Sequence, residues 1–205
     1  MRALANGYPP KGSLASTEEG RKLYQPLLKR IAMGLPVERA EIAAMLRWPL
    51  PQTEDFLKKL PALEFDEDGR LVGAGLSLRE TPHVFEVQGQ RLFTWCALDT
   101  LFFPAILGKT AQVTSKCVAT NAPIRLTVSP EAVLLLEPTS TVVSLVWSCD
   151  GPDVRRSFCN HIHFFASADA ASDWCQANPG ASVVPLSEAF SVAQTIARWL
   201  LQGRV

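Results

Sequence analysis

The run RLFTWCALDTLFFPAILG, residues 91 to 108, is an almost unbroken apolar stretch that holds one carboxylate, Asp99. Apolar side chains gain free energy when they leave water, so such a run favours a buried element. No window in the chain approaches the roughly 20 apolar residues that span a bilayer. We therefore expect this run to lie in the core of a globular fold and to carry Asp99 into apolar surroundings.

The composition agrees with a globular chain whose partner is small or a protein. The 205 residues are 47% apolar, with 20 basic and 20 acidic side chains, which suits one large domain or two small ones. A formal net charge of zero argues against nucleic acid as a partner, because phosphate contacts need concentrated Lys and Arg. The opening MRALANGYPPKGS lacks the apolar core of a signal peptide. We expect a soluble cytoplasmic protein with no membrane partner.

The first 80 residues are expected to form a winged-helix-like N-terminal domain. Helical periodicity predicts helices over 17–33, 37–48 and 51–60. The following ALEFDEDGRLVGAG predicts a strand, an acidic turn and a second strand. DNA binding is disfavoured, because Glu54 and Asp55 begin the third helix, where DNA phosphates would lie. Twelve basic against eleven acidic side chains leave residues 1–80 at only +1, so a helical cap on the rest of the chain is the alternative.

Residues 81–205 are expected to form a mixed-sheet core with flanking helices. Strand-like runs are HVFEV, AQVTSKCVA, IRLTV and TVVSLVW, separated by turn signals. One closing helix is predicted over 168–177 behind Ser167, and another begins behind Ser187. The latter should bury one stripe of side chains, Ala189, Ala193, Ile196 and Leu200. The predicted fold class is therefore α+β.

Cys96 and Asp99 are the first candidates for chemistry. If WCALDTLFFPAI opens a helix, these side chains lie at positions i and i+3 and face the same way. A carboxyl group in apolar surroundings has a raised pKa and can hold a proton near neutrality. The pKa of Cys96 is expected to shift the opposite way, because a helix N-terminus favours the thiolate. The alternative is that Asp99 caps a local turn and Cys96 only fills space.

The second candidate stretch is RRSFCNHIHFFAS, residues 155 to 167. In a strand, Cys159, His161 and His163 would share one face, and Cys96 could complete a zinc site. We favour instead a strand with hydrogen-bonded histidines. A histidine could also activate Cys96 in a cysteine-dependent hydrolase. Paired thiolates from separate segments suit a soft metal ion.

Four stretches of the chain together resemble the bacterial organomercurial lyases, also called alkylmercury lyases. They are FTWCALDTLFFPAILGKTAQVTSKC, SLRETPHVFEV, LTVSPEAV and SFCNHIHFFAS. The resemblance covers almost the whole chain and implies a winged-helix-like domain followed by an α+β catalytic core. It also implies an enzyme of mercuric resistance and detoxification that cleaves carbon–mercury bonds by protonolysis, giving a hydrocarbon and Hg(II).

The resemblance also implies roles for particular residues. Cys96 and Cys159 correspond to the family's catalytic thiols and Asp99 to its proton-handling acid, and these three would hold the Hg(II) product. Cys117 corresponds to a structural cysteine. Some relatives have a second cysteine after Cys159, where this chain has Asn160. The remaining cysteines, Cys149 and Cys175, are expected to be incidental.

The resemblance implies the following partners. Organomercurials are the substrate, small cellular thiols release the product, and mercuric reductase accepts the Hg(II). No cofactor is expected. Trp95, Phe158 and the run from Leu101 to Phe103 could supply an apolar wall around the substrate, and the alternative is that they only fill the core. Two other classes stay open from the residues alone, a metal-responsive winged-helix regulator and a cysteine-dependent hydrolase. The even charge balance weighs against the first, and the lack of a cysteine-protease signature weighs against the second.

Overall fold

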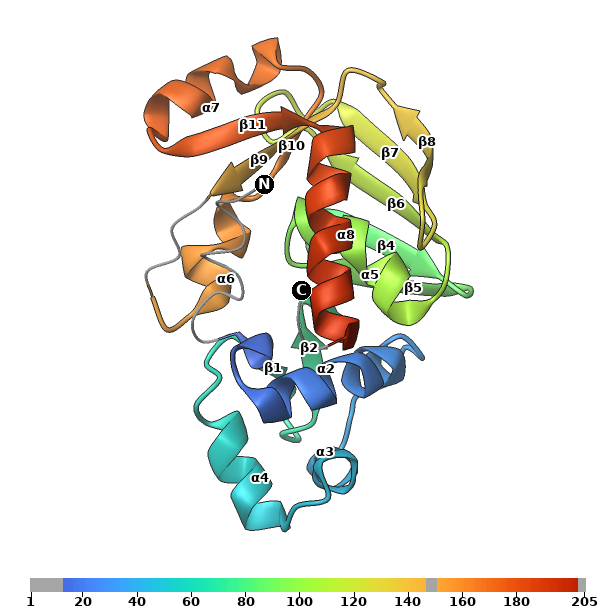
Figure 1. Cartoon of the computed structure of the whole chain (residues 1–205), viewed down its shortest axis with the longest axis vertical. Helices are drawn as coiled ribbons and strands as arrows, with labels where there is room; N and C mark the ends of the chain where they lie inside the picture. Colours follow the sequence, from blue (N-terminus) through green and yellow to red (C-terminus); the bar gives the residue numbers. More distant parts are fainter. Residues whose placement is uncertain (1–12, 147–150, 203–205) are drawn as a thin grey trace.

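The structure is a computed structural model and describes residues 13–146 and 151–202 (Figure 1). Helices near the N-terminus form one end of the molecule, and two antiparallel sheets with a long C-terminal helix form the rest. In the described part of the chain no helix is long and apolar enough to cross a membrane.

The N-terminal end contains the three predicted helices, each slightly shorter than expected. The elements are η1 (Leu14–Ser16), α2 (Glu18–Ile31), α3 (Arg39–Leu46) and α4 (Leu50–Leu57). Thr17 caps α2, because its hydroxyl oxygen accepts the backbone N–H of Gly20. The predicted hairpin follows, with Glu64 of its first strand opposite Gly73 of its second. The helix and hairpin predictions are therefore confirmed.

A large sheet contains eight strands in the order β1-β2-β3-β5-β4-β6-β7-β8. Their bounds are β1 (Glu64–Phe65), β2 (Leu71–Ala74), β3 (Leu76–Ser77), β4 (His83–Val87), β5 (Gln90–Thr94), β6 (Ala111–Lys116), β7 (Pro123–Val128) and β8 (Val133–Glu137). The smaller sheet places β9 (Val142–Val146) between β10 (Phe164–Phe165) and β11 (Ala181–Pro185). The last residue of the predicted strand TVVSLVW, Trp147, lies outside the described residues.

The prediction of a mixed sheet is wrong, because every strand pair within the two sheets is antiparallel. Several neighbouring strands are joined by short turns, such as the one between β4 and β5. A parallel pair would need a crossover of a dozen or more residues. Four strands, β3, β5, β8 and β11, were not predicted from the sequence.

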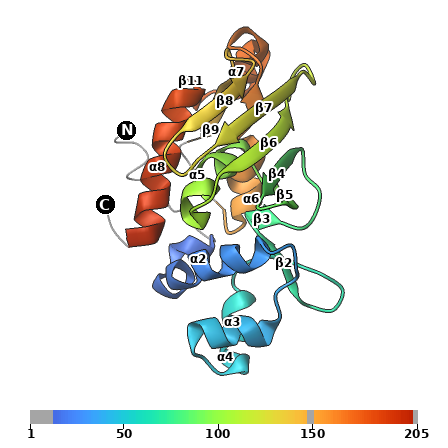
Figure 2. The same ribbon diagram turned by 90° about the vertical axis from the view of Figure 1, so that its right-hand side faces the viewer.

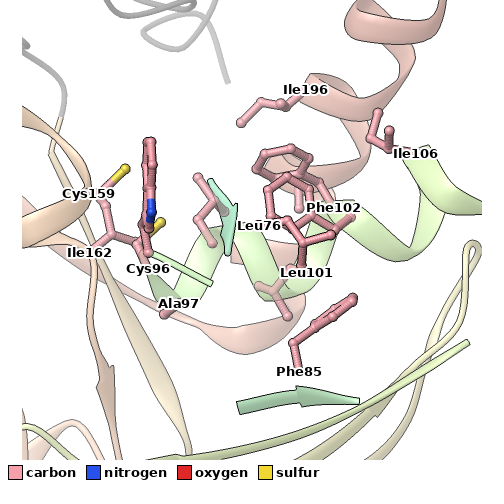
Figure 3. Packing of buried hydrophobic residues seen from close by; sticks show 14 of the residues in the cluster. Leu76, Phe85, Cys96, Ala97, Leu101, Phe102, Ile106, Cys159, Ile162 and Ile196 are labelled. Atoms are coloured by element: carbon pink, nitrogen blue, oxygen red, sulfur yellow. The ribbon is translucent and has the colours of Figure 1, made fainter. Parts of the chain in front are cut away.

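The apolar run of residues 91–108 forms β5 and then α5 (Ala97–Leu107), and all residues of α5 except Ala105 are buried. Figure 2 shows α5 between the large sheet and α8 (Leu186–Gln202). Figure 3 shows Leu101 of α5 near Phe85 of β4, and Ile196 of α8 at the opposite side of the cluster. The predicted burial of the run is confirmed, so any polar group on α5 is surrounded by protein.

Four short helical elements lie between β9 and β11 in the chain. They are α6 (Val154–Ser157), η2 (Cys159–His161), η3 (Asp169–Ala171) and α7 (Ser172–Ala177). The helix predicted over 168–177 is thus divided into η3 and α7, and Ser167 accepts the N–H of Ala170. The predicted stripe of α8 is buried, with Ala189 and Ala193 fully enclosed and Ile196 and Leu200 nearly so.

The N-terminal elements share the sheet and the core with the rest of the chain. β3 pairs with β5, and the side-chain amide of Gln25 in α2 donates to the carbonyl of Ile106 in α5 at 3.0 Å. The buried hydrophobic cluster includes residues from both parts. The division into domains at 80/81 stays a prediction, and the contacts place the N-terminal elements directly against α5.

His83 of β4 is a buried titratable side chain whose pKa reports how strongly the core excludes water. Its side chain is buried, and Nδ1 lies 2.8 Å from Oγ of Ser115 in β6. Burial, together with the nearby His163, lowers the pKa of His83 to about 4 from 6.5. The folded protein therefore binds fewer protons than the unfolded chain, so stability that is present above pH 6.5 is lost as the pH falls through 4.

We expect His83→Gln, which cannot titrate, to gain about 3 kcal/mol in unfolding free energy relative to wild type between pH 7 and pH 4. Urea unfolding of both proteins at each pH measures this difference. Titration of all other groups is shared by the two proteins and cancels. A difference that does not change with pH would contradict the assignment.

Candidate active site

Three side chains from two distant segments meet at the start of α5. The sulfur atoms of Cys96 and Cys159 and a carboxylate oxygen of Asp99 all lie within 4.8 Å of one another, and all three residues are buried. In residues 13–146 and 151–202 this is the one cluster of three such groups found. The arrangement offers two soft sulfur ligands and one acid in a single enclosed place.

The local sequence makes Cys96 and Asp99 face each other. Cys96 is the N-cap of α5 and has an extended backbone, with φ of −147° and ψ of 170°. Its sulfur accepts the backbone N–H of Asp99, while Oδ2 of Asp99 accepts the N–H of Cys96 at 3.2 Å. This is a capping box with a thiol in place of a hydroxyl. Asp99 therefore caps the helix, as the alternative expected, and it also faces Cys96, as the i, i+3 spacing predicted.

Cys159 reaches the same place from the segment after α6. Phe158 is the C-cap of α6, and Cys159 begins the short 3-10 helix η2. The N–H of Ala97 at the start of α5 donates to the carbonyl of Ile162 at 3.2 Å. Figure 3 shows Cys159 and Ile162 beside Cys96 and Ala97. This backbone contact places the thiol of Cys159 against that of Cys96.

The predicted strand through Cys159, His161 and His163 is wrong. Backbone bonds from His161 to Phe158 and from Ile162 to Cys159 close a tight turn. A turn with this spacing does not alternate side chains as a strand does.

The histidines therefore do not join the cysteines. His163 instead packs against Phe165 and Trp174. Neither His161 nor His163 belongs to the Cys96–Asp99–Cys159 cluster. The geometry gives no support to a zinc site on Cys159, His161 and His163, nor to activation of Cys96 by a histidine.

The carboxyl of Asp99 is poised to exchange a proton near neutrality. Burial raises the pKa of Asp99 from 3.8 to about 7. Hydrogen bonds from the Cys96 thiol and from the N–H groups of Cys96 and Trp95 oppose this rise, as does the charge of Arg155. The predicted direction is confirmed.

The prediction that the helix N-terminus would favour a Cys96 thiolate is wrong. Burial raises the pKa of Cys96 well above its ordinary value, and the Cys159 thiol and the charge of Asp99 add to the rise. The hydrogen bond from the Asp99 backbone opposes it but is outweighed. For Cys159, the hydrogen bond with Cys96 lowers the pKa, yet desolvation and Asp99 produce a net rise. Both thiols therefore carry protons at neutral pH.

A small cavity of about 50 Å³ opens beside this cluster and is lined by Asp99 and Cys159. Of the predicted apolar wall, Trp95, Phe158 and Phe102 line it, but Leu101 and Phe103 do not. The N-terminal elements contribute further apolar lining residues that the sequence analysis missed, including Leu14, Tyr24, Leu60 and Leu63. No local motif marks these residues, because only the packing of the N-terminal helices on α5 brings them to the cavity.

The other cysteines lie outside the cluster. Burial raises the pKa of Cys117, but hydrogen bonds from Thr120 and from the N–H groups of Ala166, Thr120 and Ala119 outweigh it, so the net shift is downward. These bonds tie Cys117 to the turn after β6 and to the segment after β10, which agrees with a structural role. Cys175 is half-buried on α7, and Cys149 lies outside the described residues.

Comparison with known proteins relates this chain to one family. The family model for MerB, alkylmercury lyase, matches residues 76–198. An alkylmercury lyase of Pseudomonas putida is 52% identical over 185 residues, covering 90% of this chain and 87% of the relative. One of Staphylococcus epidermidis is 46% identical, covering 84% and 80%. The crystal structure of a mercury-bound form of MerB2 has the same fold, with a TM-score of 0.80, 24% identity and coverage of 97% and 95%.

The raised pKa of Asp99 predicts how stability depends on pH. Because the folded carboxyl holds its proton to about pH 7, stability that is present below pH 3.8 is lost as the pH rises through 7. Asp99→Asn cannot lose a proton, so relative to wild type it should gain about 4 kcal/mol in unfolding free energy between pH 4 and pH 8. Denaturant unfolding at the two pH values measures the change. A constant difference would show that Asp99 titrates normally.

Proposed function

This chain belongs to the alkylmercury lyase family, and we propose that it cleaves the carbon–mercury bond of organomercurials with Cys96, Asp99 and Cys159. The observation that carries this assignment is the buried cluster of two thiols and one carboxyl within 4.8 Å. Mercury is a soft ion that prefers sulfur ligands, and a pair of thiols suits it far better than Mg²⁺ or Ca²⁺.

The first stage is capture of the organomercurial by the two thiols. One sulfur displaces the counter-ligand X from R–Hg–X, and the second sulfur completes a bis-thiolate adduct. Thiols lose their protons when they bind a metal. Asp99 lies close enough to take one of these protons, and the other leaves with X as HX.

The second stage is protonation of the mercury-bound carbon. Two sulfur donors raise the electron density on that carbon, and Asp99 then returns its proton to it. The carbon–hydrogen bond forms as the carbon–mercury bond breaks, which yields R–H and Hg(II) on Cys96 and Cys159, with Asp99 adjacent. A positioned acid of this kind typically contributes about 10²- to 10⁴-fold in rate.

We propose that the reaction needs no bound cofactor, and the apolar surroundings of the cluster support the proposed chemistry. The wall formed by Trp95 and Phe158 would accept the organic group and exclude water. Release of Hg(II) from two buried sulfurs requires a competing thiol, and small cellular thiols and mercuric reductase are the proposed acceptors.

We also assign the protein to the cytoplasm, a reducing compartment that suits free thiols.

The N-terminal part is proposed to be a winged-helix-like cap and not a DNA reader. Its order of three helices and a hairpin supports the comparison with winged helices. Its residues line the cavity and pack against α5, which supports a role as a cover for the site. The regulator and hydrolase alternatives have no observation that favours them.

A direct test is incubation of the purified protein with phenylmercury and excess thiol, followed by detection of benzene. We expect Cys96→Ser and Cys159→Ser each to abolish turnover, because a hydroxyl is a poor ligand for mercury. Asp99→Asn should still capture phenylmercury but release benzene far more slowly, because it lacks the exchangeable proton. Mass spectrometry of the adduct beside benzene release separates the two effects.

Cys117→Ser is the control for this series, because Cys117 lies outside the cluster. It should lower stability while folded protein keeps most of its turnover. Recovery of intact phenylmercury from the wild-type protein would refute the lyase assignment. Wild-type turnover in Asp99→Asn or Cys159→Ser would show that the proton donor or second thiolate is another residue.

The small cavity predicts that N-terminal residues limit substrate size. Its volume of about 50 Å³ is well below the roughly 150 Å³ of an engineered cavity that holds benzene. Leu60→Ala should therefore raise kcat/KM for phenylmercury relative to methylmercury by about tenfold. Leu57→Ala is the matched control, since Leu57 is equally buried but does not line the cavity. An equal change of the ratio in both variants would argue against this steric role.

A further inference from the structure

A second buried carboxylate, Glu64 of β1, lies outside the reacting cluster. It is only 8% exposed. Its Oε1 forms an ion pair with Nη1 of Arg155 in α6, and its Oε2 accepts a hydrogen bond from Oγ of Ser77 in β3. A buried charge is costly unless it is paired and hydrogen bonded, so an ion pair in this position calls for an explanation beyond stability.

The Glu64 carboxylate lies among three paired strands of the N-terminal part, β1, β2 and β3. Glu64 lies opposite Gly73 of β2, and Gly73 lies opposite Ser77. A Cβ atom added to Gly73 would overlap Oε2 of Glu64 and come within 2.9 Å of Oγ of Ser77. The position therefore excludes any side chain, and the space is occupied by the Glu64 carboxylate.

The other partner, Arg155, contacts both segments that carry the thiols. It belongs to α6, which ends immediately before Phe158 and Cys159. Its guanidinium carbon lies 5.4 Å from the ring centroid of Trp95, the residue before Cys96. One side chain thus connects the segment of Cys159 to the segment of Cys96, and the ion pair with Glu64 fixes that side chain.

We propose that Glu64 is a positioning residue, which holds Arg155 and α6 so that Cys159 stays at the distance from Cys96 that two-sulfur capture of mercury requires. The proposal rests on the proposed function, in which both thiols bind one mercury atom. It assigns the N-terminal strands a part in the reaction although they contribute no reacting atom. Small errors in the placement of a reacting group can reduce rates strongly, by up to about 10²-fold for 1 Å.

The test compares Glu64→Gln with a matched control. Glu41→Gln removes the charge of another N-terminal acid, whose Oε2 lies 2.7 Å from Nε of Arg30 and which does not line the cavity. We expect Glu64→Gln to slow phenylmercury capture and to lower kcat/KM for benzene release by about tenfold. Glu41→Gln should leave both unchanged even where its Tm falls.

A double-mutant cycle shows whether Glu64 acts through Arg155. Arg155→Met should reduce capture by a similar factor, and adding Glu64→Gln to it should cause no further loss. Independent effects that multiply would overturn the proposal, as would wild-type capture in Glu64→Gln. If Glu64→Gln does not fold, Ser77→Ala, which keeps the ion pair, should give a smaller decrease in the same direction, and wild-type capture by it overturns the proposal.

Capture is scored separately from hydrocarbon release, so the two ideas fail differently. Wild-type protein that captures phenylmercury but releases no benzene refutes the lyase chemistry, and the capture rates still decide the role of Glu64. Wild-type protein that releases benzene, together with a Glu64→Gln variant that matches it, leaves the lyase and removes the positioning role. Wild-type protein that captures no phenylmercury refutes both.

Discussion

The site depends on the burial of one carboxyl group at the start of a helix that is enclosed on nearly every side. The large sheet and α8 lie against α5, and N-terminal residues line the cavity beside Asp99, so its side chain is removed from water. Loss of hydration disfavours the carboxylate and moves its pKa to about 7. Reciprocal hydrogen bonds with Cys96 hold the Asp99 side chain in the site despite the free-energy cost of its lost hydration. The acid that the chemistry needs is therefore a consequence of how the core is assembled.

Much of this could be predicted from the sequence, because the signals are local. The apolar run around Asp99 indicated burial, and the spacing of Cys96 and Asp99 indicated a shared face at a helix start. The hairpin around Gly69 and the buried stripe of α8 followed from turn residues and periodicity. These features are decided by neighbours within a few positions, and the structure confirms them.

Other features could not be predicted, because they depend on contacts between distant segments. The pKa of Cys96 follows from its enclosure and from the thiol of Cys159, which outweigh the helix N-terminus. Cys159 lies in a tight turn where alternation of residues predicted a strand, since the segment is tied to α5 at Ala97. Leu60 reaches the cavity only through packing of the N-terminal part. Periodicity carries no information on such contacts.

The directions of the three pKa shifts fit together in one physical picture. With both thiols protonated, the buried cluster carries at most the single charge of the Asp99 carboxylate before substrate arrives, and the pKa of about 7 lets this carboxylate take up a thiol proton near neutrality. Permanent thiolates in this place would be expensive, because isolated buried charges are strongly disfavoured. A soft metal ion changes the balance, since each sulfur loses its proton only as a sulfur–mercury bond forms. Charge separation is thus confined to the moment of binding, and the proton that is released remains within reach of the carbon that must accept it.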